Sequence, residues 1–273
     1  MPELPEVETV KRALVPVVTN KQIKSVFVGT KQLRWPFPSF LESMLNNKTC
    51  GAPLRRGKYI LIPVTNKHIL LIHLGMSGSI RIYTNRPNLQ RHDHFGIEFD
   101  GDQWLVFNDP RRFGYIDLFP ESNVDSHRLL RNLGPEPLSD EFTAEYLLTQ
   151  TVGKTCTIKS LLLDQSKIAG IGNIYASEAL FKAAISPKRQ AMTIKRTKAE
   201  RLVPAIKAIL TKSIAFGGTS LRDHIQPSGE IGYFAQSLEI YGRSGEPCVN
   251  CGSIVKEIKQ TGRTTFYCSL CQR

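Results

Sequence analysis

The chain has 273 residues and carries 36 Lys and Arg against 24 Asp and Glu, a formal net charge of +12. The hydrophobic fraction of 41% against 22% charged residues excludes a chain that is disordered throughout. The length predicts about two domains with a small appendage. The basic excess favours a polyanionic partner, above all a nucleic acid, over an anionic membrane surface or a basic surface without a partner.

Neither a membrane span nor a secretory signal is predicted. The apolar stretch over 59–74 is interrupted by Pro63, by Asn66 and by two histidines, so it is too short to cross a bilayer. The N-terminus, MPELPEVETV, is acidic and proline-rich, unlike a signal peptide. We therefore expect a cytosolic protein, in which clustered cysteines bind metal more readily than they form disulfides.

The first 120 residues predict a β-rich domain. Short β-branched and aromatic runs alternate with Gly, Pro, Asn and Asp, which is typical of strands joined by turns. One helix, over about 6–14, precedes them, and closely spaced short strands indicate a sandwich or a barrel. The expected strands are 23–28, 59–64, 69–73, 79–83, 95–99 and 104–108.

After Pro120 the pattern becomes helical. Apolar residues recur at helical spacing, and glycines and prolines separate the segments. The polar segment 222–232 contains Pro227, Gly229 and Gly232 and is expected to be a mobile loop. The expected helices are 140–149, 158–163, 174–183 and 198–216.

Four of the six cysteines form two C-x2-C pairs, Cys248 with Cys251 and Cys268 with Cys271. Two such pairs at this separation can place four thiolates tetrahedrally around one zinc ion, which we favour over disulfides or unrelated thiols. Between the pairs, Thr261-Gly262 indicates the turn of a β-hairpin. A basic hairpin on a basic protein favours a nucleic-acid partner.

The N-terminus offers a reactive amine. Pro2 follows Met1, and an initiator methionine before a small residue is normally removed, which would leave Pro2 with a free secondary amine. An α-amino group has a pKa of ~8, against ~10 for lysine, so it can attack an aldehyde-like carbon near neutral pH. Glu3, beside it, could transfer protons. The competing interpretation is a proline that only starts a helix.

Five blocks of the sequence, in order, resemble the formamidopyrimidine-DNA glycosylases, and the resemblance spans the chain. Position 4 is leucine, where the related endonuclease VIII group typically has glycine, and this favours oxidised purines over oxidised pyrimidines as substrates. The blocks are MPELPEVE (1–8), RRGKY (55–59), NDPRRFG (108–114), AGIGNIYASE (169–178) and GRTTFYC (262–268).

The resemblance implies an α+β multidomain fold. Its parts would be an N-terminal catalytic β-sandwich (2–120), a helix–two-turn–helix DNA-binding domain (131–223) and a four-cysteine zinc finger (239–273). The implied activity is excision of 8-oxoguanine and formamidopyrimidines, followed by β,δ-elimination at the abasic site. The implied protein is a monomer of the bacterial cytosol and nucleoid. It would hold one structural zinc, bind damaged double-stranded DNA and use neither a membrane nor a small-molecule cofactor.

The resemblance also implies catalytic roles. Pro2 would attack the sugar C1′, Glu3 would protonate and deprotonate the opening deoxyribose, and Lys58 would serve the β-elimination. Arg263, beside the tip of the zinc hairpin, would aid the δ-elimination and hold the phosphates that flank the lesion. From the residues alone, Lys58 could equally be a surface lysine or a phosphate contact.

DNA contacts follow from the same resemblance. Met76, Arg111 and Phe113 would fill the space left by an extruded base. The residues alone would allow a core methionine, a core phenylalanine and a salt-bridged arginine instead. The other implied contacts with DNA are His92, Asn173, Lys159 and either Lys154 or Thr155.

Two alternatives remain at this stage. One is an endonuclease VIII-like glycosylase for oxidised pyrimidines. The other is a non-catalytic zinc-ribbon DNA-binding protein, which would account for the charge and the cysteines but not for Pro2-Glu3 together with Lys58.

Overall fold

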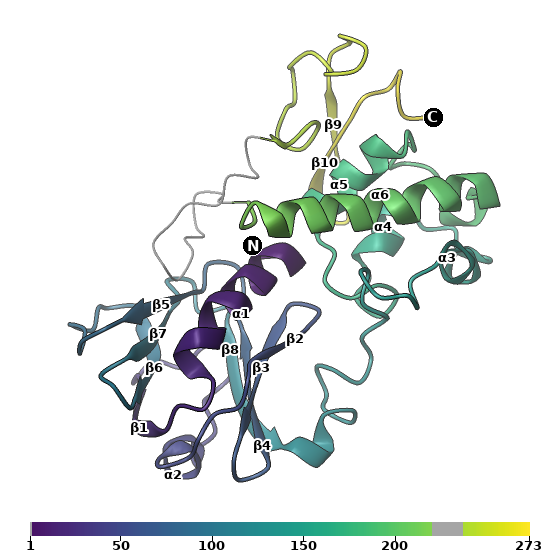
Figure 1. Ribbon diagram of the computed structural model, residues 1–273. Helices are drawn as coiled ribbons and strands as arrows, with labels where there is room; N and C mark the ends of the chain where they lie inside the picture. The colour runs from purple at the N-terminus through teal and green to yellow at the C-terminus, as the bar shows by residue number, and fades with distance from the viewer. Residues whose placement is uncertain (1, 220–236) are drawn as a thin grey trace. The chain divides into compact units, whose positions relative to one another are not determined.

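The structure is a computed structural model that describes residues 2–219 and 237–273 (Figure 1). The chain divides into two compact units. The first comprises the described residues of 1–131 and 216–235, and the second those of 132–215 and 236–273. The expected mobile loop over 222–232 lies outside the described residues.

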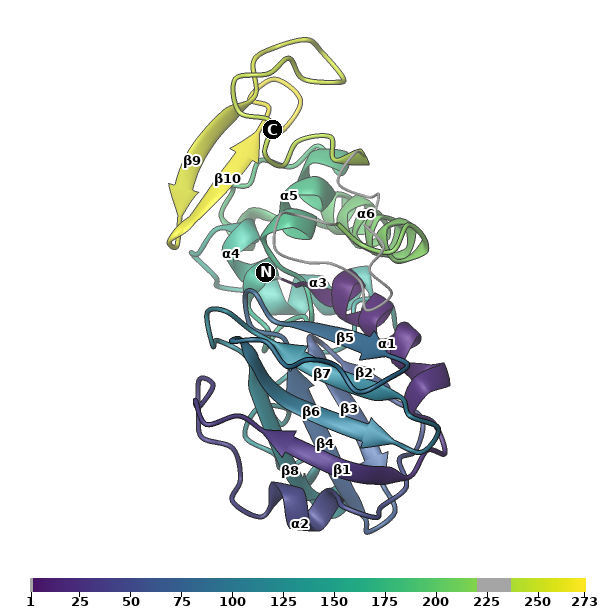
Figure 2. The same ribbon diagram turned by 90° about the vertical axis from the view of Figure 1, so that its left-hand side faces the viewer.

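Two four-stranded antiparallel sheets form the first unit, one in the order β1-β6-β7-β5 and the other in the order β2-β3-β4-β8. Figure 2 shows the two sheets layered face to face as a sandwich, as expected. Their strands are β1 (Ile23–Val28), β2 (Leu54–Arg56), β3 (Tyr59–Val64), β4 (His68–His73), β5 (Ser79–Tyr83), β6 (Asp93–Phe99), β7 (Trp104–Asn108) and β8 (Tyr115–Pro120). The unit also contains the short helix α2 (Leu41–Leu45) and the 3₁₀ turn η1 (Glu121–Asn123).

Two of these strands were not expected from the sequence. Strand β2 has three residues, two of them arginines, and it is extended because it pairs with β3, with Leu54 opposite Leu61. Strand β8 follows a Pro-Arg-Arg turn and completes the second sheet by pairing along the whole of β4. Both depend on a partner strand, which a local pattern does not reveal.

Helix α1 (Leu4–Val18) packs its apolar face into the sandwich core. Val7, Val10 and Leu14 are buried there at helical spacing. The helix continues past its expected end, through the exposed Pro16. Burial of Val17 and Val18 holds this last turn against the core although Pro16 cannot donate a backbone hydrogen bond.

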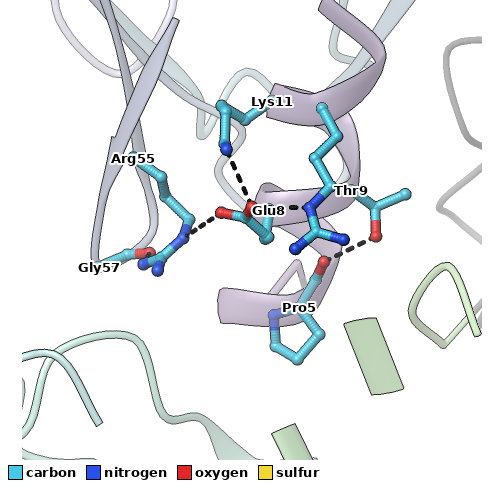
Figure 3. Close-up of polar contacts among 7 residues, drawn as sticks. Pro5, Glu8, Thr9, Lys11, Arg55 and Gly57 are labelled. Atoms are coloured by element: carbon cyan, nitrogen blue, oxygen red, sulfur yellow. Dashed lines mark hydrogen bonds and ion pairs between the residues drawn. The ribbon is translucent and has the colours of Figure 1, made fainter. Parts of the chain in front are cut away.

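An ion-pair cluster joins α1 to the β2–β3 hairpin (Figure 3). Oε2 of Glu8 accepts a hydrogen bond from Nε of Arg55 at 2.9 Å, and Oε1 pairs with Lys11 and Arg12, each at 2.9 Å. Burial acts to raise the pKa of Glu8, but the three basic partners outweigh it and hold the pKa below its usual range. Arg55 also donates to the carbonyl oxygen of Gly57 at 3.0 Å.

The second unit is helical and ends in a two-stranded hairpin. Two of its helices begin at threonines, Thr143 and Thr157, whose side chains accept a backbone N–H of the first turn. No described helix in the chain is long and apolar enough to cross a membrane. The elements are α3 (Ala144–Thr151), α4 (Ile158–Leu163), α5 (Asn173–Lys182), η2 (Ala191–Thr193), α6 (Arg196–Ala215), β9 (Lys256–Gln260) and β10 (Arg263–Tyr267).

A buried carboxylate on α5 anchors the segment that leads to the cysteines. Glu178 is 4% exposed and accepts hydrogen bonds from three successive backbone N–H groups, those of Glu239, Ile240 and Tyr241, at 2.8–3.0 Å. Burial raises the pKa of Glu178 and the three donors offset this only in part. The path of the chain into the zinc finger is thereby fixed on α5.

The Glu8 cluster has a measurable consequence for stability. Because the folded-state pKa of Glu8 lies below its unfolded value, its stabilisation is present above about pH 4.5 and is lost as the pH falls through the folded-state pKa. We predict that Glu8→Gln destabilises the protein by about 2 kcal/mol at pH 7, because the mostly buried cations of Lys11 and Arg55 lose the negative charge opposite them. Thermal unfolding across pH 3–7 should show the gap to the wild type closing below pH 4.5.

Glu145→Gln is the matched control. Glu145 pairs with Arg196 at 2.7 Å, but both side chains are more than half exposed, so its loss should leave the melting temperature close to that of the wild type at every pH. A Glu8→Gln protein whose melting temperature tracks the wild type at every pH would contradict the prediction.

Candidate functional site

The first residues of the chain are held in place by the glutamate that lies one turn into α1. Pro2 is buried, and Glu3, at 2% exposure, is the N-cap of the helix. Glu6 accepts a hydrogen bond from the backbone N–H of Glu3 at 2.9 Å through Oε2. Its Oε1 accepts from both the backbone N–H and the hydroxyl of Thr219, each at 2.8 Å. Pro2 and Glu3 therefore stand on a fixed helix end whose dipole favours a carboxylate there.

Lys58 lies in the same unit and is 8% exposed. It follows Gly57, whose φ of 55° makes the left-handed turn between β2 and β3. The contacts from Glu8 through Arg55 to the Gly57 carbonyl connect α1, one turn after Glu3, to the residue that precedes Lys58. The structure thus ties together the two sequence segments that contain the predicted catalytic residues Pro2, Glu3 and Lys58.

His73, the last residue of β4, lies near Lys58 and Arg34, although in the sequence it only interrupts an apolar run. Burial, and then the charges of Lys58 and Arg34, lower the pKa of His73 to about 4, so the ring is neutral at physiological pH. Its Nδ1 accepts a hydrogen bond from the backbone N–H of Gly75 at 3.2 Å, which places the ring proton on Nε2. A neutral ring with this tautomer offers one N–H donor.

The predicted void-filling residues are exposed, and the alternative that Met76 and Phe113 are core residues is wrong. Met76 is 37% exposed and Phe113 42% exposed. The guanidinium carbon of Arg111 stands 5.0 Å from the centre of the Phe113 ring, close enough for a cation–π contact. His92, also predicted to contact DNA, is half-buried near the buried His94, with ring centres 6.5 Å apart.

A pocket of about 620 Å³ opens beside these residues. Its wall combines apolar and cationic side chains, so it suits a group that has both a flat apolar part and a negative charge. Among the lining residues are Arg34, His73, Met76, Arg111, Arg112 and Phe113. No sequence motif indicated Arg34 or His73, because Arg34 on one loop and His73 at the end of β4 are brought beside Phe113 only by folding.

In the second unit, Asn173 and Lys159 meet the hairpin. Asn173 is the first residue of α5, and its Nδ2 donates to the carbonyl oxygen of Thr264 at 2.9 Å. Nζ of Lys159 lies 2.6 Å from Oδ1 of Asn173 and 2.6 Å from the hydroxyl of Thr265. Lys159 is 1% exposed, so its ammonium is not on the surface, where a phosphate contact would need it.

The remaining predicted DNA contacts of this unit are at the surface. Arg263 is exposed at the start of β10, directly before the two threonines that contact Lys159 and Asn173. Lys154 and Thr155 are both exposed, so burial does not separate them as candidates. The backbone carbonyl of Lys154 accepts from the N–H of Met192 at 3.0 Å, which fixes this turn.

The four predicted metal ligands converge. One Sγ atom from each of Cys248, Cys251, Cys268 and Cys271 lies within 4.8 Å of the others. The Sγ atoms of Cys251 and Cys268 are 3.5 Å apart, and those of Cys248 and Cys271 are 3.9 Å apart. Four thiolates bound tetrahedrally at about 2.3 Å would stand about 3.8 Å from one another. The cluster is therefore consistent with one structural zinc, while Cys50 and Cys156 lie outside it.

The chain matches three family models. The formamidopyrimidine-DNA glycosylase N-terminal domain matches residues 1–116, the H2TH domain of the same glycosylase matches residues 133–224, and the zinc finger found in FPG and IleRS matches residues 245–273. A formamidopyrimidine-DNA glycosylase from Thioalkalivibrio sulfidiphilus is 46% identical, and the alignment covers all of both chains.

Solved structures agree over the full length. A Lactococcus lactis FPG mutant in complex with Fapy-dG-containing DNA superposes with a TM-score of 0.92 at 33% identity, and all of both chains is covered. MutM in complex with DNA containing carbocyclic 8-oxo-G superposes with a TM-score of 0.91 at 34% identity, again over all of both chains. With its β-sandwich, helical domain and four-cysteine zinc finger, this chain belongs to the formamidopyrimidine-DNA glycosylase family.

Proposed function

We propose that this chain excises oxidised purines, such as 8-oxoguanine and formamidopyrimidines, from DNA and then cleaves the abasic product by β,δ-elimination through Pro2. The excision activity follows from membership of the family, and relatives have been crystallised with DNA that contains these lesions. The observation that carries the lyase activity is the connection of the Pro2-Glu3 helix end to the Lys58 turn through Glu8 and Arg55.

The chemistry begins at the amine of Pro2 once Met1 has been removed. The amine nitrogen forms a bond to C1′ while the bond from C1′ to the damaged base breaks, and the base leaves with a proton. Loss of the amine proton and opening of the sugar ring give an iminium ion at C1′. We assign to Glu3, which follows Pro2 at the helix end, the transfer of a proton to the ring oxygen and the later removal of one.

Strand cleavage follows from the iminium. Removal of a proton from C2′ forms a C2′–C3′ double bond as the C3′–O bond to the 3′ phosphate breaks. Removal of a proton from C4′ then breaks the C5′–O bond to the 5′ phosphate, and water hydrolyses the iminium to release Pro2. We assign the first elimination to Lys58, a buried lysine that directly follows the Gly57 turn linked to α1 through Arg55 and Glu8. We assign Arg263 to the second, because its exposed guanidinium at the start of β10 can hold a flanking phosphate in a bidentate manner.

We assign the binding of damaged duplex DNA to the net positive charge and to three exposed residues, Met76, Arg111 and Phe113, called the reading residues below. Met76, Arg111 and Phe113 would occupy the space left by the extruded base, and their apolar area would be covered by base pairs. His92, Asn173 and either Lys154 or Thr155 are proposed to contact phosphates. We propose that Lys159 instead supports Asn173 and the hairpin from the interior, since its ammonium is buried between them.

We propose three functional domains, 2–120, 131–223 and 239–273. In this proposal the catalytic residues Pro2, Glu3 and Lys58 belong to the first. Asn173 belongs to the second and Arg263 to the third.

The assignment of Pro2 predicts a covalent product. Sodium borohydride should trap the protein on 8-oxoguanine DNA through residue 2, because only an iminium is reduced to a stable amine. Pro2→Gly or an uncleaved N-terminal extension should lower the trapped yield by at least about tenfold. The same tag at the C-terminus is the control. Full lyase activity in the extended protein would overturn the assignment.

Glu3 and Lys58 should fail at different steps. In single-turnover assays at saturating enzyme, Glu3→Gln should abolish release of 8-oxoguanine while lesion affinity stays nearly intact and a preformed abasic site is still cleaved in part. Lys58→Ala should slow 8-oxoguanine release on the order of a hundredfold yet still form the iminium at the abasic site.

Lys24→Ala, at an exposed position on β1, is the matched control for the loss of a lysine and should leave both rates unchanged. A thymine glycol duplex assayed in parallel with the wild type compares the excision of an oxidised pyrimidine with that of 8-oxoguanine. Unchanged rates with only weaker binding in both variants would remove Glu3 and Lys58 from the catalytic site.

The metal site predicts one zinc per chain by elemental analysis. Cys248→Ser should lose that zinc and weaken DNA binding by at least about tenfold, because structural zinc contributes folding energy to the hairpin that carries Arg263. Cys156→Ser, at an exposed cysteine outside the cluster, should keep both. Normal DNA affinity in the metal-free protein would contradict this role.

A further inference from the structure

Asp109 is a fully buried carboxylate at the end of β7, at the centre of the loops that carry the reading residues. Its Oδ1 accepts a hydrogen bond from the hydroxyl of Ser77 at 2.6 Å and a weaker one from the backbone N–H of Arg111 at 3.3 Å. Its Oδ2 accepts from the backbone N–H of Gly114 at 2.7 Å. One side chain therefore contacts the loop that presents Met76 and both ends of the loop that presents Arg111 and Phe113.

The main chain of Asp109 connects a third loop. Its N–H donates to the carbonyl oxygen of His92 at 2.9 Å, and its carbonyl accepts from Nε2 of the buried His94 at 3.0 Å. A second carboxylate strengthens this connection, since Asp93 accepts from Nδ2 of Asn108 at 2.7 Å. The three loops that carry Met76, His92 and the Arg111–Phe113 pair thus converge on a single residue.

Backbone packing leaves these loops little freedom to shift. Gly75 has a φ of 65°, and a Cβ atom there would come within 2.4 Å of the backbone of Phe113. A Cβ on Gly114 would come within 2.5 Å of the Phe107 ring and 3.0 Å of the Asp109 carboxylate. Because the backbones are in direct contact, a change at Asp109 must move the loops rather than be absorbed by side chains.

We propose that Asp109 is a positioning residue that holds the loops of Met76, His92, Arg111 and Phe113 as one rigid DNA-contacting surface at the lesion. The proposal rests on the proposed void-filling role of Met76, Arg111 and Phe113 and on the proposed phosphate contact of His92. Asp109 itself is buried and touches no DNA. It fixes the positions of the exposed side chains before DNA binds. These side chains are therefore already arranged to fill the space that the extruded base leaves.

A carboxylate is required at this position for a chemical reason. Three donors converge on two oxygens, and each oxygen has lone pairs to accept them. The amide of asparagine keeps one acceptor and points an NH₂ group at a donor, so at least one contact becomes repulsive. Glutamate would add a methylene to a site without exposed surface.

The test compares Asp109→Asn with the wild type on two readouts that lost stability alone would not change. The first is the ratio of single-turnover 8-oxoguanine excision opposite cytosine and opposite adenine, at saturating enzyme. The second is the fluorescence of 2-aminopurine opposite a stable tetrahydrofuran abasic analogue, which reports side chains entering the helix. We expect excision opposite cytosine to fall tenfold to a hundredfold, on the order expected for about 1 Å of misplacement. Whatever opposite-base preference the wild type shows in this assay should be lost, so that the ratio approaches one, and the fluorescence change should be largely lost.

Iminium trapping by Asp109→Asn on a single-stranded abasic oligonucleotide should stay within about twofold of the wild type, because no opposite strand has to be held there.

Glu98→Gln is the matched control. Glu98 accepts from the hydroxyl of Ser25 at 2.6 Å, the same kind of pair, at the other end of β6 and away from the three loops. It should leave both readouts unchanged.

Ser77→Ala is the second variant, in case Asp109→Asn does not fold. It removes one donor to the carboxylate, together with the hydroxyl oxygen that accepts from the Arg111 N–H at 3.2 Å, and keeps Asp109 itself, so both readouts should move in the same direction but less. Met76→Ala tests the proposed function separately, and unchanged readouts in that variant would refute void filling. If Met76→Ala changes both readouts while Asp109→Asn and Ser77→Ala leave them at wild-type values, Asp109 is not a positioning residue.

Discussion

The reactive amine proposed here belongs to the backbone of Pro2, so it cannot be adjusted by a side-chain rotation, and its position depends on how the first helix is held. Two glutamates of α1 hold it. Glu6 connects the N–H of Glu3 to Thr219, and Glu8 connects the next turn to Arg55 and through it to the carbonyl of Gly57. The buried face of the helix supplies most of the adhesion to the sandwich, but apolar packing is non-directional. The carboxylates supply the direction, since their hydrogen bonds fix the helix relative to the turn before Lys58.

A buried carboxylate also holds the loops that carry Met76 and Phe113, but here the side chains that it positions are exposed. Met76 and Phe113 leave apolar area in water in the free protein, which is unfavourable until DNA covers them. Flexible loops would let such side chains collapse onto the protein surface. The buried Asp109, with donors from the loops that surround it, prevents this, because any collapse would leave a buried carboxylate without partners. The loops are thus held open by the cost of breaking a buried polar network.

Buried charges also organise the second unit. Lys159 holds Asn173 and the hairpin threonines together, and Glu178 holds the segment at 239–241 on α5. The four cysteines close the hairpin from its other side. Arg263 therefore projects from a strand that is secured by a buried lysine on one side and by thiolates suited to zinc on the other. This arrangement gives an exposed arginine a defined location without requiring contacts to its own side chain.

Local sequence patterns determined the strands at 23–28, 59–64, 79–83 and 104–108, because short β-branched and aromatic runs bounded by turn residues favour extended backbone. The cysteine spacing determined the zinc ligands, and Thr261-Gly262 determined the hairpin turn, since both residues adopt positive φ there. The resemblance to a known family supplied the candidate roles of Pro2, Glu3 and Lys58. Only the tertiary structure decided that β2 and β8 are strands, that Lys159 is buried, that Glu8 pairs with Arg55 47 residues away, and that three loops converge on Asp109. Each of these depends on groups that are distant in the chain and adjacent in space, and neither the residue type nor its neighbours in sequence specify which partner the fold will bring.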